Sequence, residues 1–286
     1  MGGRVVMPFG IVDSHVHFWD PAELHYPWLD AVPALRRPFL PPDYAAATRD
    51  APIAGIVFVE GNCHRDEAGR EVALAERLAQ AEPRLAGIVA FLDLTDPDTL
   101  DRRLDALARS PRVAGVRHNI QGQPAGWCRQ RAFVEGVRRV GSRGLTFDLC
   151  VTHDQLADVV ALVDGCPDTR FVLDHCGKLA IRERLLKPWS EELIRLAGHG
   201  NVYCKLSGLL TEASVQWCED DLLPYATHAI ESFGPERLLY GSDWPVLTLA
   251  GAYRDWYGFT ERLTAGWSAA ARRGFYCGNA TRVYGL

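Results

Sequence analysis

Two histidines stand two residues apart near the start of the chain, in the run Ile11-Val-Asp-Ser-His-Val-His17. Successive side chains of a β-strand point to opposite faces, so His15 and His17 would share one face if this run is a strand. Two imidazoles at that spacing could hold one ion or one substrate between them. The pair alone is weak evidence, because histidines at this spacing also occur packed or solvent-exposed without a ligand.

A carboxylate near the end of the chain strengthens the case. Asp243 directly follows the apolar run 237–242, within the segment Gly241-Ser-Asp-Trp-Pro245. If the strand at 237–242 closes against the strand at 11–17, Asp243 lies beside the two imidazoles. Burying an unpaired carboxylate is costly, and a cation, or a bound water that needs a base, would explain its presence there.

Eight apolar runs are candidates for the strands that position these groups. They are nearly continuous in hydrophobicity, as in Gly55-Ile-Val-Phe-Val59, which is typical of parallel strands covered by helices. The runs are 11–17, 54–60, 85–92, 113–119, 145–151, 170–175, 201–206 and 237–242. Amphipathic patterns between them predict helices at 66–81, 99–110, 131–143, 153–164, 189–198, 222–233 and 252–265.

Eight strands alternating with helices favour an α/β fold in which a (β/α)8 barrel forms a single domain over residues 1–286. A doubly wound open sheet is the alternative, but no glycine-rich phosphate fingerprint follows the first strand. In a barrel of this kind the functional groups gather at the carboxyl ends of the strands.

Polar residues follow strand after strand at these carboxyl ends: Glu60, Arg117, His118, His153, Asp174, His175, Lys178 and Asp243. Arg117 could clamp a carboxylate or carbonyl through its planar fork, or it could form a salt bridge inside the barrel. Lys178 and Lys205 could each contact a substrate or pair with Asp148 or Asp174 inside the barrel. His118 and His153 are further candidates for substrate contacts.

Aromatic residues could form the walls of a pocket at the same end. A loop of about two dozen residues joins the first strand to a helix near Asp43 and holds Trp28, and loops this long often form binding lids. The alternative is a loop packed on the barrel rim for stability. Trp244, which precedes Pro245, is expected to shape the last turn and one pocket wall.

Composition excludes several classes of protein. The formal net charge is −5, so the chain lacks the basic surplus of a nucleic-acid-binding protein. No apolar run of about 18 residues predicts a membrane span, and the start Met-Gly-Gly-Arg lacks the apolar core of a signal peptide. We therefore expect a cytoplasmic protein with a small-molecule partner, and its oligomeric state stays open. Its eight cysteines form no C-x-x-C pair and are expected to be reduced core residues.

Five segments together resemble the amidohydrolase superfamily: Ile11–Pro21, Gly115–His118, Asp174–Lys178, Gly241–Pro245 and Gly278–Leu286. They are similar to the amidohydrolase-related (amidohydrolase 2) branch, which includes sugar lactonases of the fuconolactonase and rhamnonolactonase types, sulfomuconolactonase and 2-pyrone-4,6-dicarboxylate hydrolase. The resemblance implies a distorted TIM barrel. It also implies that Asp243 is the general acid and base, that His15 and His17 bind a metal or polarise the substrate, and that His175 orients water or substrate.

The resemblance also bears on the metal. Strand five, Phe147-Asp-Leu-Cys-Val151, has no histidine, and no bridging lysine is evident, so the chain departs from the two-metal members. We expect one divalent ion, Zn²⁺, on His15, His17 and Asp243, with Glu60 or His175 nearby. Such an ion lowers the pKa of water and polarises a carbonyl. A metal-free site, in which imidazoles and Arg117 stabilise the oxyanion, is the alternative.

The resulting hypothesis is a hydrolase that opens a lactone ester, most simply a sugar-acid lactone, with water activated by Asp243. One alternative is a non-oxidative decarboxylase of an aromatic acid, and another is a lactonase of the 2-pyrone-4,6-dicarboxylate type. A catalytically silent binding protein that kept the barrel is a third, but the intact His15, His17, His175 and Asp243 speak against it.

Overall fold

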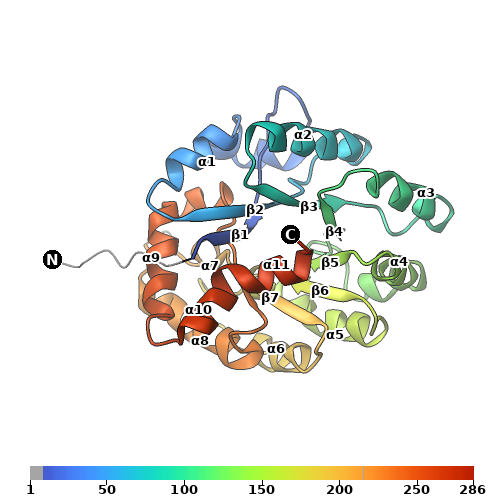
Figure 1. Cartoon of the computed structure of the whole chain (residues 1–286). Coiled ribbons are helices and arrows are strands. Elements are labelled where there is room, and N and C mark those ends of the chain that lie inside the picture. The colour runs from blue at the N-terminus through green and yellow to red at the C-terminus, as the bar shows by residue number, and fades with distance from the viewer. Residues whose placement is uncertain (1–8, 215) are drawn as a thin grey trace.

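Eight parallel strands form one sheet in the order in which they occur in the chain (Figure 1). The computed structural model describes residues 9–214 and 216–286. The strands are β1 (Ile11–Val16), β2 (Ile53–Val59), β3 (Leu85–Phe91), β4 (Val113–Arg117), β5 (Thr146–Leu149), β6 (Arg170–Leu173), β7 (Val202–Leu206) and β8 (Leu238–Tyr240). Each expected strand is confirmed, with ends that differ by a few residues, mostly because the strands stop earlier than the apolar runs.

The barrel closes between its first and last strands through very few contacts. Val16 and Trp244 form an isolated parallel bridge, in which the N–H of His17 donates to the carbonyl of Trp244 at 2.8 Å. The N–H of Asp243 donates to the carbonyl of His15 at 2.9 Å. Register shifts interrupt the first three strand pairs, which makes the barrel a distorted one. This junction between β1 and β8, which we call the seam, therefore contains residues that were expected to carry the chemistry.

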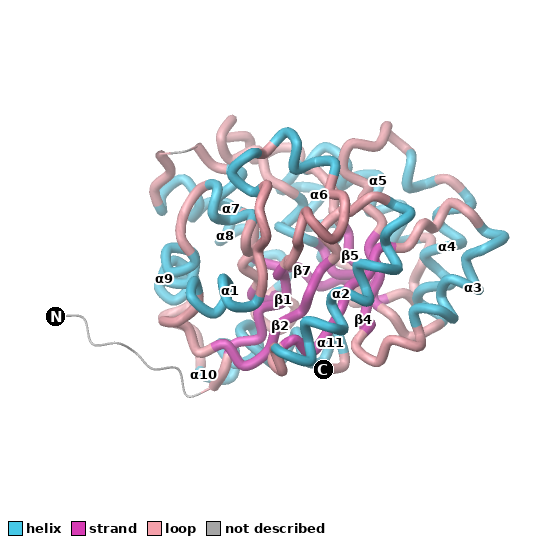
Figure 2. The backbone as a smooth tube through the Cα atoms, turned by 90° about the horizontal axis from the view of Figure 1, so that it is seen from above, coloured by secondary structure: helices cyan, strands magenta, loops and turns pink. Residues whose placement is uncertain are grey.

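Helices surround the strands, as the side view in Figure 2 shows. They are α1 (Pro41–Ala47), α2 (Ala68–Ala81), α3 (Pro97–Leu107), α4 (Arg131–Ser142), α5 (Leu156–Asp164), α6 (Trp189–Ala197), α7 (Leu209–Glu212), α8 (Glu219–Phe233), α9 (Tyr253–Leu263), α10 (Ala269–Arg273) and α11 (Asn279–Tyr284). The start of α3 illustrates how local sequence determines where a helix begins. Asp96 caps the helix by accepting the N–H of Asp98 at 3.2 Å, and Pro97 follows at the first helical position. The short helices α7, α10 and α11 were not among the helices expected from the pattern.

The long loop after β1 packs against the barrel. Trp19 is fully buried, and its indole N–H donates to the carbonyls of Leu35 and Arg37 at 3.2 and 3.0 Å. Trp19 also pairs with Phe39 in an antiparallel bridge. The base of the loop is therefore packed on the barrel, which was one of the two alternatives for this loop. Trp28, near the tip of the loop, is only half-buried.

All eight cysteines are free thiols, as expected, and six of them are buried, whereas Cys218 is exposed and Cys277 is half-buried, so these two are not core residues. Among residues 9–214 and 216–286, no helix is long and apolar enough to cross a membrane.

Candidate active site

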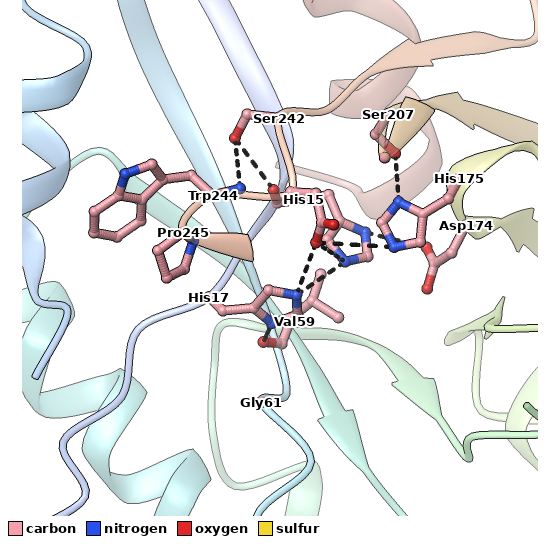
Figure 3. A network of polar contacts seen from close by, with 12 residues as sticks. His15, His17, Val59, Gly61, Asp174, His175, Ser207, Ser242, Trp244 and Pro245 are labelled. Atoms are coloured by element: carbon pink, nitrogen blue, oxygen red, sulfur yellow. Dashed lines mark hydrogen bonds and ion pairs between the residues drawn. The ribbon is translucent and has the colours of Figure 1, made fainter. Parts of the chain in front are cut away.

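Four buried side chains meet at the carboxyl end of the barrel, and we call them the histidine–aspartate cluster: His15, His17, His175 and Asp243 (Figure 3). The Nε2 atoms of His15 and His17 lie 3.2 Å apart. Asp243 Oδ1 lies 3.3 Å from His17 Nε2 and 3.7 Å from His15 Nε2. His175 Nε2 is 3.9 Å from the same oxygen. The structure thus brings together four residues that the sequence placed at three different strand ends.

Left-handed backbone turns present two members of the cluster. Asp243 has a φ of 61° and His175 a φ of 52°, values that non-glycine residues rarely adopt. Gly208 makes room for the imidazole of His175, since a Cβ at this position would lie 2.7 Å from its Nδ1. The neighbouring Ser207 hydroxyl is 2.9 Å from the same nitrogen. The rings and the carboxylate are therefore held in place by their own turns and by close packing.

Asp13 fixes the seam from the side of the surrounding helices α1 and α9, because a register shift between Asp13 and Val16 interrupts the alternation along β1. Its Oδ1 accepts the N–H of Ser242 at 2.8 Å, and its Oδ2 accepts the hydroxyls of Tyr44 and Tyr253 at 2.9 and 3.1 Å. Burial raises the pKa of Asp13 to about 6. Asp13 was not among the residues expected to matter, although a carboxylate inside an apolar strand is costly unless it is hydrogen-bonded and so is itself a signal.

Inside the barrel lie five buried charged side chains that we call the buried charge network: Glu60, Arg117, Asp148, Asp174 and Lys205. Lys205 Nζ lies 2.6 Å from Asp148 Oδ2 and 2.9 Å from Asp174 Oδ1. Arg117 Nη1 lies 3.1 Å from Asp174 Oδ2, and Arg117 Nε donates to Glu60 Oε1 at 2.6 Å. Arg117 thus forms the barrel salt bridge that sequence analysis gave as the alternative to a clamp.

The expected ligand role of Glu60 does not fit this arrangement. Its Oε1 is held by Arg117, and its Oε2 accepts the N–H of Asn62 at 2.6 Å. Among the described residues, two groups could hold a metal ion, one formed by His15, His17 and Asp243 and the other by His15, Asp174 and His175. Glu60 belongs to neither.

Neighbouring acceptors decide which ring nitrogens carry protons. The Nδ1 of His17 lies 2.8 Å from the carbonyl of Val59, which can only accept, so this nitrogen holds the proton and Nε2 presents a lone pair. The Nδ1 of His15 lies 3.2 Å from Asp174 Oδ1, which can only accept, and 3.2 Å from Lys205 Nζ, which can only donate. When Nδ1 carries the proton and shares it with Asp174, the Nε2 of His15 also presents a lone pair, and two lone pairs and a carboxylate oxygen converge on one point.

This donor set fits a divalent cation. Three acceptor atoms within 3.7 Å of one another repel unless a proton or a cation lies between them. Two neutral imidazoles and one carboxylate form the usual protein ligand set of a catalytic metal with an open position, and the ring of His17 is oriented by its further contact to the carbonyl of Val59. Three residues, His15, His17 and Asp243, therefore suit a metal by chemistry as well as by position.

Burial controls the protonation of the cluster. It lowers the pKa of His15 well below its usual value of 6.5 and that of His175 to about 4, so both rings are neutral near pH 7. Burial raises the pKa of Asp243. The interactions of its carboxylate with His175 and His17 outweigh burial and hold the pKa of this carboxyl below its usual value. Asp243 is therefore a carboxylate at neutral pH.

A pocket of about 360 Å³ opens onto the cluster. His17, His175 and Asp243 form one side of its lining, and the predicted residues Arg117, Lys178 and Trp28 also reach it. Its lining further includes three carboxamides and a thiol that sequence analysis missed: Asn62, Asn119, Gln121 and Cys150. A usable signal existed for one of them, because Asn119 ends the expected strand 113–119 two residues after Arg117, and a period of two places both on the same side.

His118, which was expected to contact the substrate, is not part of the lining of this pocket. Its ring packs among Phe91, Trp127 and Phe133, with ring centroids 5.1 to 5.5 Å apart. The Nδ1 of His118 accepts the N–H of Leu94 at 3.2 Å. His118 is therefore a core residue between the barrel and its helices.

Two more predicted contacts are not brought to the pocket. His153 lies outside the lining, with its Nδ1 3.3 Å from the carbonyl of Lys178. Trp244 is buried against Phe18 and Phe39, and Figure 3 shows its indole pointing away from the histidines. It therefore anchors the last turn from the core and does not form a pocket wall.

Sequence and structure comparisons place this chain among known proteins. The family model described as Amidohydrolase matches residues 12–286. An L-fucono-1,5-lactonase of Burkholderia multivorans is 33% identical over 300 residues, which cover 96% of each chain. An L-fucono-1,5-lactonase of Burkholderia ambifaria is 30% identical over 282 residues, which cover 96% of this chain and 94% of the relative. The crystal structure of a Burkholderia multivorans amidohydrolase with bound zinc superposes with a TM-score of 0.88 at 33% identity, covering 97% of this chain and 100% of the other.

Proposed function

The chain belongs to the amidohydrolase family, and we propose that it is a hydrolase that opens the ester ring of a sugar-acid lactone. The observation that carries this proposal is the convergence of His15 Nε2, His17 Nε2 and Asp243 Oδ1 beside a pocket that His17 and Asp243 line. The relatives named L-fucono-1,5-lactonase, at 33% and 30% identity over nearly the whole chain, favour lactone opening over decarboxylation of an aromatic acid.

The metal in this proposal is one zinc ion, held by His15, His17 and Asp243. When bound, such an ion lowers the pKa of water and polarises the carbonyl of the ester. Zinc is favoured by the nitrogen and oxygen donor set and by the zinc-bound structure of the similar Burkholderia multivorans protein.

Asp243 moves the proton in the proposed reaction. As a carboxylate at neutral pH it accepts a proton from the attacking water, whose oxygen forms a bond to the lactone carbonyl carbon. When the bond between this carbon and the ring oxygen breaks, Asp243 returns the proton to the ring oxygen, and the product is a hydroxy acid. The neutral His175, 3.9 Å from Asp243, is placed to orient the water or the carbonyl.

The lining of the pocket favours a neutral, hydroxyl-rich substrate. Asn62, Asn119 and Gln121 offer carboxamides, which can both donate to and accept from hydroxyls. The charge of Arg117 is balanced by Glu60 and Asp174. Lys178 is the other cation of the lining, so a dicarboxylate of the 2-pyrone type would find one such cation for its two carboxylates. The indole of Trp28 suits the apolar face of a sugar ring.

A panel of lactones with a pH indicator tests the proposal. We expect proton release from sugar-acid lactones, loss of this activity after chelation and its return with Zn²⁺. Asp243→Asn should lower kcat by about a thousandfold, whereas Asp66→Asn, which changes an exposed carboxylate, should leave it unchanged. Release of CO₂ from hydroxybenzoates, with no proton release from any lactone, would replace the proposal with the decarboxylase alternative.

A further inference from the structure

The C-terminal helix α11 closes the amino end of the barrel, opposite the pocket. Figure 1 shows it crossing the barrel end, with the C-terminus over the centre of the ring of strands. Asn279 anchors the helix by donating to the carbonyls of Pro235 and Leu238 at 2.8 and 2.7 Å, beside the start of β8. Arg170, the first residue of β6, donates to the carbonyl of Val283. These bonds fix the last turn of the helix under the barrel interior.

From this position Tyr284 reaches the buried charge network. Its hydroxyl donates to Asp148 Oδ2 at 2.7 Å, and its ring lies 5.5 Å from Lys205 Nζ. The side chain is buried. Thr146 makes the other hydroxyl contact to Asp148, 3.2 Å from Oδ1.

Short contacts continue from Asp148 to the histidine–aspartate cluster. Asp148 Oδ2 accepts hydrogen bonds from the hydroxyl of Tyr284 and from Lys205 Nζ, which lies 2.6 Å away. The same ammonium lies 2.9 Å from Asp174 Oδ1 and 3.2 Å from His15 Nδ1. Whichever of Asp174 and Lys205 faces His15 Nδ1 more closely decides whether this nitrogen donates or accepts.

We propose that Tyr284 is a positioning residue for the reaction, acting through Asp148 and Lys205 on the orientation and tautomer of His15. Without its hydroxyl, Asp148 Oδ2 keeps Lys205 as its charged partner, and the ammonium can follow Asp148 away from Asp174 and His15. A hydrogen bond to a buried carboxylate is strong and directional, so its loss shifts the groups that depend on it. The kinetic part of this inference rests on the proposed lactonase function.

Tyr284→Phe removes the hydroxyl and keeps the ring, and Tyr276→Phe is the matched control. Tyr276 is also buried, but its hydroxyl contacts Thr260 and Thr264, away from the network. We expect Tyr284→Phe to lower kcat for the lactone by about tenfold, the size typical of partners that orient a ligand. KM should stay within about twofold, because the ring does not touch the pocket. The control should keep both constants.

A second measurement needs no activity and so separates this inference from the proposed function. In protein with ¹⁵N-labelled histidine, the ring nitrogens of His15, identified by their absence in His15→Gln, should change shift in Tyr284→Phe and not in Tyr276→Phe. If Tyr284→Phe does not fold, Thr146→Val, which removes the other hydroxyl contact of Asp148, takes its place. Unchanged His15 signals together with an unchanged kcat would overturn the inference, whatever lactone the wild type accepts.

Discussion

His118 makes the stability of the protein depend on pH, and replacing it by asparagine should remove that dependence. The imidazole is 1% exposed, and burial lowers its pKa to about 4 from the usual 6.5. Its Nδ1 accepts the N–H of Leu94, while its Nε2 has no hydrogen-bond partner among the described residues. A proton on Nδ1 would break the one bond that the ring makes, so the folded state resists protonation.

The sign of the effect follows from which state binds the proton first. Between pH 6.5 and about 4 the unfolded chain binds a proton at His118 and the folded chain does not, so the free energy of unfolding falls as the pH falls. The gap of about 2.5 between the two pKa values corresponds to about 3.4 kcal/mol at about 1.36 kcal/mol per unit. Above pH 6.5 this residue contributes no slope.

Urea unfolding at several pH values, followed by tryptophan fluorescence, measures the effect. In His118→Asn the side-chain oxygen can still accept the N–H of Leu94, so the variant loses ring packing at every pH. The difference in unfolding free energy between wild type and variant should shrink by about 3 kcal/mol from pH 7 to pH 4. His25→Asn, at an exposed histidine, is the control. A difference that stays constant with pH would refute the reasoning.

Two other substitutions test the assigned geometry. Glu60→Gln should keep the bound metal, as measured by metal content. It should lower the free energy of unfolding by about 3 kcal/mol, because it leaves the buried charge of Arg117 without one of its carboxylates. Loss of the metal at unchanged stability would restore Glu60 as a ligand. Gly208→Ala should lower kcat by about tenfold or more, because the new Cβ would displace the imidazole of His175. Gly234→Ala, at a glycine of similar φ (68° against 71°) with no atom within 4 Å of the new Cβ, should keep the activity at a comparable cost in stability.

The barrel could be predicted because its signals are local. Each strand is a nearly continuous apolar run, and the long amphipathic patterns between them became helices with ends shifted by a few residues. Short helices such as α7 and α11 have too few turns to show a period. The core of the site, His15, His17, His175 and Asp243, followed from the rule that parallel strands gather their functional groups at one end.

The rest of the site could not be predicted from the sequence, because it depends on the direction in which each side chain points and on contacts between residues far apart in the chain. His118 was assigned to the pocket because it ends an apolar run, yet the neighbouring Arg117 occupies the inward position. The sequence alone could not show whether Lys205 pairs with Asp148 or contacts a substrate, because a lysine is suited to either role. Tyr284 reaches Asp148 from the far end of the chain, a contact that no local pattern indicates.

The seam between β1 and β8 also determines when the site can exist during synthesis. His15 is synthesised well before Asp243 and Tyr284, and the site needs all three regions of the chain. A partly synthesised chain therefore holds the two first-strand histidines without their carboxylate, and the network without its tyrosine. Long-range closure of this kind makes folding slow and leaves apolar strand edges exposed until β8 and α11 have been made. Products of premature termination should accordingly be inactive and prone to aggregate.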